Sequence, residues 1–138
     1  MSDIEQLASD LIAQHTEIER RLLAAGFRHP ERLHDAAYEA GLTGDMLSTR
    51  EHCAAFCALI QCSCDGIEPS IERVAIVLVD QGVKVNRPEL ETWLTAESDP
   101  DGIEEDAKLV ARFARTRCEA AEAIAELRRK LEVASCLD

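Results

Sequence analysis

The C-terminal segment most strongly constrains the fold, because residues 103 to about 131 contain neither glycine nor proline. Apolar residues recur along this segment at helical spacing, which predicts one uninterrupted helix. At 1.5 Å per residue, its roughly 29 residues span about 43 Å. A globular head of about 100 residues is only about 34 Å across. The helix is therefore predicted to extend beyond the head, with apolar side chains on the part that projects.

Residues 1–101 read as a run of shorter helices separated by glycine and proline. Ser2 with Glu5 and Ser48 with Glu51 match the capping box, in which a serine and a glutamate three residues later satisfy the first free amide groups of a helix. Helices are therefore predicted to begin near both serines, and the second of these helices contains most of the cysteines.

The glycines support the same division of the chain. All six are expected to lie in connections between helices, at positions 26, 41, 44, 66, 82 and 102. The stretch "SIERVAIVLVDQG" is rich in β-branched residues and could form a buried strand. Ser70 and Gly82 at its ends, and the lack of a second strand to pair with it, favour a helix instead. The sequence thus predicts an all-α protein, with a compact bundle of about five short helices in residues 1–101, the head, and one long C-terminal helix in residues 102–138 used for association.

The chain carries a formal charge of −12, and 46% of its residues are hydrophobic. No apolar run approaches the length needed to cross a bilayer, so no membrane contact is expected. The N-terminus "MSDIEQLASD" lacks the basic and apolar blocks of a signal peptide, which predicts a cytoplasmic protein. An acidic surface repels the phosphate backbone, so direct binding of nucleic acid is not expected and basic protein partners are favoured.

Four of the six cysteines lie within "EHCAAFCALIQCSCDG". At 100° per residue, Cys53, Cys57 and Cys64 fall on one apolar stripe of a helix, while Cys62 falls on the opposite side. Because a tetrahedral zinc site needs four ligands that converge on one point, this pattern predicts small buried hydrophobic residues and neither a metal nor a cofactor. A thiol or metal sensor that uses Cys62, Cys64 and Cys118 stays open as an alternative.

The chain contains no recognisable catalytic motif. It lacks the phosphate loop G-x-x-x-x-G-K-[ST], the zinc motif H-E-x-x-H and the nucleophile elbow G-x-S-x-G. The histidines are dispersed; His15 continues an apolar helical stripe, and His34 and His52 are expected at the surface. A non-enzymatic protein is therefore predicted, with no catalytic residue.

Four segments occur in order along the chain: "EIERRLLAAGFRHPERLHDAAYEAGLTGDML", "TREHCAAFCALI", "GIEPSIERVAIVLVDQG" and "EEDAKLVARFARTRCEAAEAIAEL". In order and spacing, residues 17 to about 131 resemble the N-terminal domain of DnaB-type replicative helicases. The corresponding family patterns are a Leu-rich helix ending in "DPE-x-L", then "hR-x-I-F-x-A-I", "G-x-P-x-D-x-V-T-L-x-x-x-L-x-x-x-G" and "Y-A-x-I-V-R-E-x-x-x-R-R-x-I". Phe56 stands at the aromatic position of the second pattern, Ser70 replaces the usual Asp of the third, and the Tyr of the fourth is missing.

The resemblance implies a helical head followed by a helical hairpin through which two copies dimerise, forming a collar that binds primase and, in some systems, helicase loaders. The helicase-binding domain of bacterial primase has a related fold. The family's ATP-hydrolysing motor is not found in these residues, and the second helix of the hairpin is missing or reduced to "VASCLD".

The expected function is therefore a protein interaction domain that self-associates, as a homodimer, and docks to replication proteins such as helicase, primase or a loader. The residues expected to make the contact lie on the projecting helix, namely Ile124, Leu127, Arg128 and Leu131. A generic helical adaptor, whose likeness to the helicase domain comes only from common helix patterning, is the other alternative.

Overall fold

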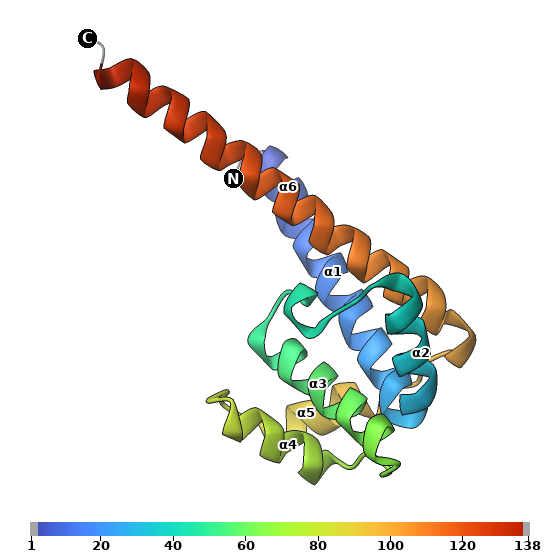
Figure 1. The fold of residues 1–138 in the computed structure, drawn as a ribbon. Helices are drawn as coiled ribbons and strands as arrows, with labels where there is room; N and C mark the ends of the chain where they lie inside the picture. The colour runs from blue at the N-terminus through green and yellow to red at the C-terminus, as the bar shows by residue number, and fades with distance from the viewer. Residues whose placement is uncertain (1–2, 137–138) are drawn as a thin grey trace.

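The computed structural model describes residues 3–136. These form helices joined by short connections and contain no strand. The all-α prediction is confirmed, although Ser2 of the first predicted capping box lies outside the described residues. In chain order the elements are α1 (Asp3–Arg28), α2 (Pro30–Ala40), the 3-10 turn η1 (Gly44–Met46), α3 (Arg50–Asp65), α4 (Ile71–Asp80), α5 (Arg87–Leu94), the 3-10 turn η2 (Pro100–Gly102) and α6 (Ile103–Cys136). Figure 1 shows α2 to α5, the C-terminal part of α1 and the start of α6 gathered into a head, from which the rest of α6 projects.

Helix α3 lies at the centre of the head, in contact with α1, α2 and α4. Helix α5 closes the head between α1 and α4, and the first part of α6 packs on α1 and α2. The largest apolar side chains that are fully buried here are Leu22, Leu23, Leu33, Leu59, Leu78, Leu90, Leu94 and Ile103. The contacts along this core join every helix of the head to at least two others, so the head has one continuous interior.

The β-branched stretch is a helix, as its end signals predicted. The Ser70 side chain accepts a hydrogen bond from the backbone amide of Arg73 and caps α4. Gly82 follows the helix with φ of +73°, a conformation that favours glycine. Val74 and Leu78, one turn apart, are fully buried, so α4 rests on the core by a single narrow stripe.

The predicted start of α3 at Ser48 is wrong by one residue. Thr49 is the N-cap, and its side chain accepts a hydrogen bond from the amide of His52 at 3.0 Å. The amide of Ser48 instead donates to the carboxylate of Glu19 in α1, at 2.7 Å. A tertiary contact has therefore taken the residue that the local pattern assigned to the cap.

Gly26 does not lie in a connection as predicted, because α1 continues through it to Arg28. A Cβ at this position would overlap Cδ2 of Leu33 and lie 3.1 Å from its Cβ and Cγ. Glycine is needed here for the close approach of α1 and α2. The sequence pattern treats every glycine as a break and does not detect this use.

The variant Gly26→Ala should therefore be less stable than the wild type by about 1–3 kcal/mol, the usual result of overpacking a core. On helix propensity alone, the same change would stabilise the protein by about 0.5–1 kcal/mol. Urea unfolding followed by circular dichroism measures the difference. Gly102→Ala is the control, since a Cβ there has open space around it. A Gly26→Ala chain as stable as that control would contradict the packing argument.

Helix α6 is longer than predicted, with 34 residues that include Val133–Cys136, so this part of "VASCLD" continues α6 and does not form a second hairpin helix. Ala114 is its last buried residue, and every described residue from Arg115 to Cys136 is exposed. The predicted overhang is thus present (Figure 1). Within the described residues, no helix is both long and apolar enough to cross a membrane.

Candidate interaction surface

Helices α1 and α6 run antiparallel and are joined by an ion pair. The guanidinium of Arg21 donates two hydrogen bonds to Asp106, Nε to Oδ2 and Nη2 to Oδ1, both at 2.8 Å. The Asp106 side chain is only 9% exposed. A bidentate pair of this kind is directional as well as strong, because both donors must face both acceptors. It fixes the register of α6 on α1 at the base of the projecting part.

Two further contacts hold α6 where it leaves the head. The ring of His15 in α1 stacks on Phe113, with centroids 3.7 Å apart and an angle of 19° between the planes. Nη2 of Arg117 donates to the backbone carbonyl of Met46 in η1 at 2.6 Å. On the N-terminal side of His15, the described side chains of Asp3–Gln14 are exposed. From Arg115 onward, the described side chains of α6 are exposed as well. The packing of α1 against α6 therefore ends at His15 and Phe113, at the same point along both helices.

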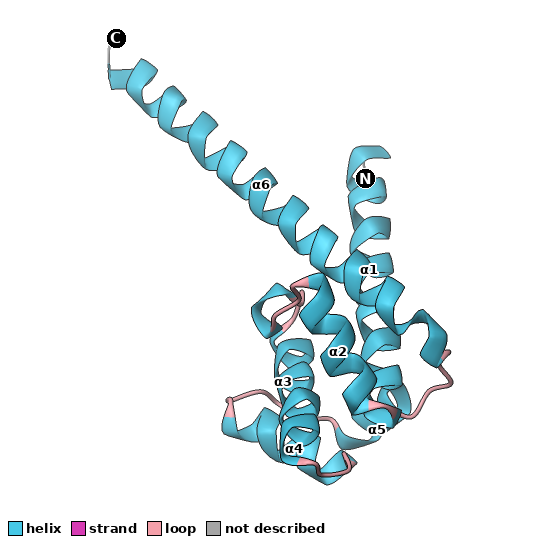
Figure 2. Cartoon of the chain, turned by 45° about the vertical axis from the view of Figure 1, so that its right-hand side comes forward, coloured by secondary structure: helices cyan, strands magenta, loops and turns pink. Residues whose placement is uncertain are grey.

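Figure 2 shows that above this level α1 and α6 diverge in the shape of a V. Leu11 and Ile12 of α1 are 47% and 65% exposed, so the arm formed by α1 also presents apolar surface. Small soluble proteins seldom leave apolar side chains exposed along two neighbouring helices, and such patches usually mark sites of protein contact. We call the part of α6 from Arg115 to Cys136 the distal arm.

One stripe runs the whole length of α6. Residues at alternating steps of three and four, starting from Ile103, lie within an arc of about 140° on a straight helix. In the head this stripe is Ile103, Asp106, Val110 and Phe113, which are buried or pack against α1. On the distal arm the same stripe continues as Arg117, Ala120, Ile124, Leu127, Leu131 and Ala134. The face that the head covers at its base is therefore uncovered further along.

The structure places all four predicted contact residues on the distal arm, and three of them lie on this stripe. Ile124, Leu127 and Leu131 are 53%, 58% and 60% exposed. Arg128 lies at the edge of the stripe, one residue after Leu127. Val133 is equally exposed at 60%, but it lies on the opposite side of the helix, about 180° from Ile124.

Charge divides the distal arm into two halves. Residues 118–127 contain Glu119, Glu122 and Glu126 and no basic side chain. Residues 128–135 contain Arg128, Arg129 and Lys130 with one acid, Glu132. Arg129 pairs with Glu126 across the boundary of the two halves. Along the other arm, Asp3–Gln14 contains acidic residues and no Lys or Arg.

A buried polar pair fixes α1 against α3 beneath the V. His52 was predicted at the surface, but its side chain is 1% exposed, and its Nδ1 lies 3.1 Å from Oε1 of Glu19, which is 2% exposed. Nε of Arg20 donates to Nε2 of the same ring at 3.4 Å, which leaves Nδ1 as the ring nitrogen that donates to Glu19. The nitrogen that a general base would offer to a nucleophile is therefore already occupied. The pair holds helices together.

The pKa of Glu19 reflects this network. Burial raises the pKa of the carboxyl, but hydrogen bonds from His52 and Ser48 outweigh burial and leave the pKa below its ordinary value. The carboxylate is thus the form that the folded protein prefers. Because the folded pKa is lowered, the stabilisation is complete at neutral pH and is lost as the pH falls through that lowered value.

The variant Glu19→Gln should lower the free energy of unfolding at pH 7 by about 1–3 kcal/mol, because an amide replaces a buried hydrogen-bonded carboxylate. The difference from the wild type should shrink below about pH 4.3, the ordinary pKa of a glutamate, as Glu19 of the wild type becomes protonated. Urea unfolding at pH 7 and at a pH below about 4.3 measures the difference in the free energy of unfolding. Glu72→Gln, at an exposed carboxylate, is the control. An equal difference at both pH values would contradict the assignment of charge.

The prediction for the cysteines of α3 is wrong. Cys62 is buried, whereas Cys57 and Cys64 are exposed and Cys53 is half-buried. The buried face of α3 is instead built around three fully or nearly fully buried alanines, Ala54, Ala55 and Ala58, together with Phe56 and Leu59. The sequence argument followed the large and sulfur-containing residues and gave no weight to the alanines, which allow neighbouring helices to approach closely.

The positions and pKa values of the thiols in residues 3–136 bear on whether they could bind a metal. Burial raises the pKa of Cys62, and desolvation and the charge of Asp45 raise that of Cys57. Such thiols stay protonated at neutral pH, and the thiolate is the form that binds metals and attacks disulfides. Within residues 3–136, no three His, Cys, Asp or Glu side chains are grouped so that they could hold an ion, and Cys62, Cys64 and Cys118 are therefore not brought together.

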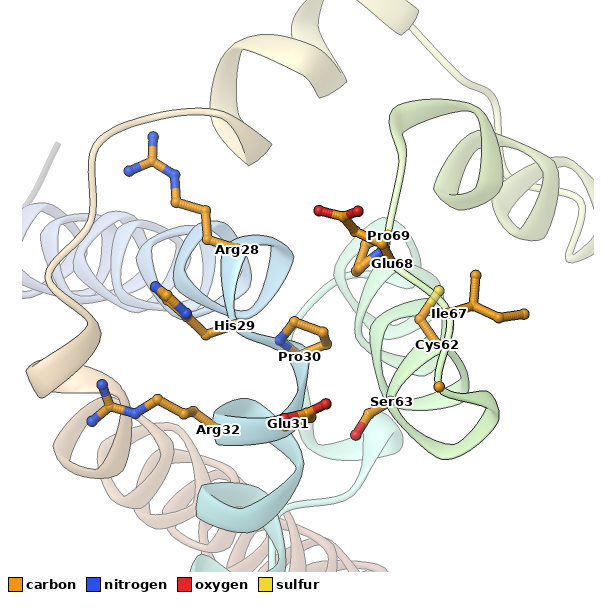
Figure 3. Close-up of a pocket in the computed structure, with 11 residues that line it drawn as sticks. Arg28, His29, Pro30, Glu31, Arg32, Cys62, Ser63, Ile67, Glu68 and Pro69 are labelled. Atoms are coloured by element: carbon orange, nitrogen blue, oxygen red, sulfur yellow. The ribbon is translucent and has the colours of Figure 1, made fainter.

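A hollow of about 340 Å³ lies between the start of α2 and the end of α3. Figure 3 shows Arg28, His29 and Arg32 on its α2 side, pointing away from α3, while Glu31 points toward Ser63. Arg28 donates to the carbonyl of Thr95, so this guanidinium is already engaged outside the hollow. The side chains that face one another here are therefore not a cluster of cations, and the hollow does not form an anion site.

Comparison of the chain with protein-family models, with curated proteins and with solved structures gives no match. The function must therefore be inferred from the residues themselves. Among the surfaces described, the V formed by α1 and the distal arm combines a continuous apolar stripe with an ordered distribution of charge.

Proposed function

We propose that this protein is a non-enzymatic helical interaction domain that self-associates through the distal arm of α6 and docks to proteins of the replication machinery. The observation that carries the proposal is the exposed stripe of Ile124, Leu127 and Leu131 on a helix that leaves the head. A second protein surface that covered this stripe would remove it from water.

The energy available supports association. Fully burying a Leu or Ile side chain contributes about 1.5–3 kcal/mol, and these three side chains are a little over half exposed. Three such residues on each of two chains supply several kcal/mol, before the cost of bringing two molecules together. The ordered base of α6, fixed by Arg21 and Asp106, reduces the part of that cost that would come from orienting the helix.

The choice of replication proteins as partners rests on the resemblance to the helicase N-terminal domain. Its support is the order and spacing of the four segments and the expectation, drawn from the family, of a helical head with a projecting helix. The acidic charge of the chain, −12, agrees with a basic protein partner. On this proposal helicase, primase or a loader binds the head, and the homodimer is the form that binds.

The double variant Ile124→Glu and Leu127→Glu should abolish self-association, because two charges would replace the centre of the apolar stripe. Light scattering after size-exclusion chromatography should show a dimer for the wild type and a monomer for the variant. Val133→Glu is the matched control, since Val133 is equally exposed on the other face of the same helix and its change should leave the dimer intact. Loss of the dimer in the control as well would mean that charge on the arm, and not the stripe, is responsible.

Docking is tested separately by retention of purified replicative helicase and primase on the immobilised protein. At least one of them should be retained by the wild type and released at raised salt, because charged surfaces are screened by ions. Circular dichroism of the Ile124→Glu and Leu127→Glu variant should match the wild type, which shows that the head is folded. Failure of the wild type to retain either protein would contradict the assignment to replication while leaving self-association standing.

A further inference from the structure

We propose that the V between α1 and the distal arm receives the distal arm of a second copy, antiparallel to the first, so that two chains form one two-fold symmetric bundle. This inference rests on the proposed function and specifies its geometry. The occupant is a second copy because the stripe and the charges of the distal arm are complementary to themselves in one orientation and not in the other.

The apolar layers match in the antiparallel orientation. If Ile124 of one chain lies opposite Leu127 of the other, steps of three and four place Leu131 opposite Ala120 and Ala134 opposite Arg117. Ile124 and Leu127 then face each other at the centre, whereas Leu131 and Arg117 each meet an alanine. Large side chains opposite small ones allow close packing of two helices. Two-fold symmetry repeats every pair, so six layers form along residues 117–134, about 26 Å of helix.

The charges match in the same orientation. Glu119 of the acidic half lies on the same edge of the stripe as Lys130 of the basic half, so in the antiparallel pair it lies beside Lys130 of the second copy, and the symmetry repeats this contact. A parallel pair would instead place acid beside acid and base beside base. Among the described residues neither of these two side chains forms an ion pair within the chain, so both can pair with the second copy. Like charges brought together oppose binding, so the charges select the antiparallel form.

The arm of α1 fits the same arrangement. In the bundle, the incoming distal arm runs parallel to α1 and its C-terminal end reaches the base of the V, where His15 stacks on Phe113. Its basic half therefore passes along Asp3–Gln14, a segment that carries Asp10 and no basic side chain. Leu11 and Ile12 supply apolar surface on that arm. Both walls of the V are thus suited to the same helix.

Cysteine cross-linking tests the geometry in a chain with Cys118→Ser and Cys136→Ser. Chains with Ala120→Cys and chains with Leu131→Cys are mixed and mildly oxidised, and the cross-linked peptides are identified by mass spectrometry. The antiparallel bundle predicts a disulfide between position 120 of one chain and position 131 of the other. Glu122→Cys mixed with Arg129→Cys is the control, because these positions have the same separation along the pair but lie on the far face of the helix. They should not cross-link.

Charge reversal tests the orientation by a second measurement. Lys130→Glu should weaken self-association about tenfold or more, because attraction to Glu119 becomes repulsion at two symmetric contacts. Mixing this variant with Glu119→Lys should restore a mixed dimer. Analytical ultracentrifugation measures both effects. In a parallel pair, the first variant would leave the dissociation constant unchanged.

The outcomes separate this inference from the proposed function. Cross-links between positions 120 and 131, with tenfold weakening by charge reversal, support the bundle. A dimer that needs Ile124 and Leu127 but cross-links 120 to 120 or 131 to 131, or that ignores charge reversal, overturns the antiparallel bundle and leaves self-association through the distal arm intact. A wild-type chain that stays monomeric throughout a dilution series overturns the bundle and self-association together, and leaves docking to be decided by retention of helicase and primase.

Discussion

The ion pair between Arg21 and Asp106 is the contact on which the shape of this protein depends. It joins the two longest helices at the edge of the head, and its bidentate geometry allows one register of α6 on α1. Hydrogen bonding to Asp106 raises the pKa of Arg21, so the guanidinium keeps its charge. From this point the direction of the distal arm is fixed, and with it the position of every side chain that the arm presents.

The head provides the rigid base that this arrangement needs. Alanines on α3 let α1, α2 and α4 pack closely around one central helix, and the absence of a side chain at Gly26 does the same for α1 and α2. Glu19 and His52 then tie α1 to the start of α3 through a fully buried pair. Small residues set the distances between helices, and a few directional polar contacts set their registers.

Much of this fold follows from the sequence, since end signals and periodicity are local. The cap at Ser70, the start of α6 at Ile103 and the exposed residues of the distal arm are all where the pattern predicts them. The errors share one cause, which is that burial depends on neighbours distant in sequence. His52 is buried because Glu19, 33 residues earlier, accepts a hydrogen bond from its ring.

The candidate surface was predictable only in part for the same reason. Ile124, Leu127 and Leu131 could be found from spacing and from the length of the helix, because a helix longer than its domain must leave it. The divergence of α1 from α6 could not, because it depends on where their packing ends, at His15 and Phe113. The division of the distal arm into acidic and basic halves is visible in the sequence, but its meaning requires knowing that nothing in the head covers that part of the helix.

The way α6 leaves the head also bears on how the distal arm holds its shape. Starting a helix in water is difficult because several residues must be ordered before the first hydrogen bond forms, whereas each later residue is added at little cost. In α6 the buried turns from Ile103 to Ala114 are already formed, so the arm is extended from an existing template. Its amide protons should therefore exchange with solvent in a gradient, slowest at the base and fastest at the tip, and the turns around Ile124 should spend most of their time helical even in a single chain.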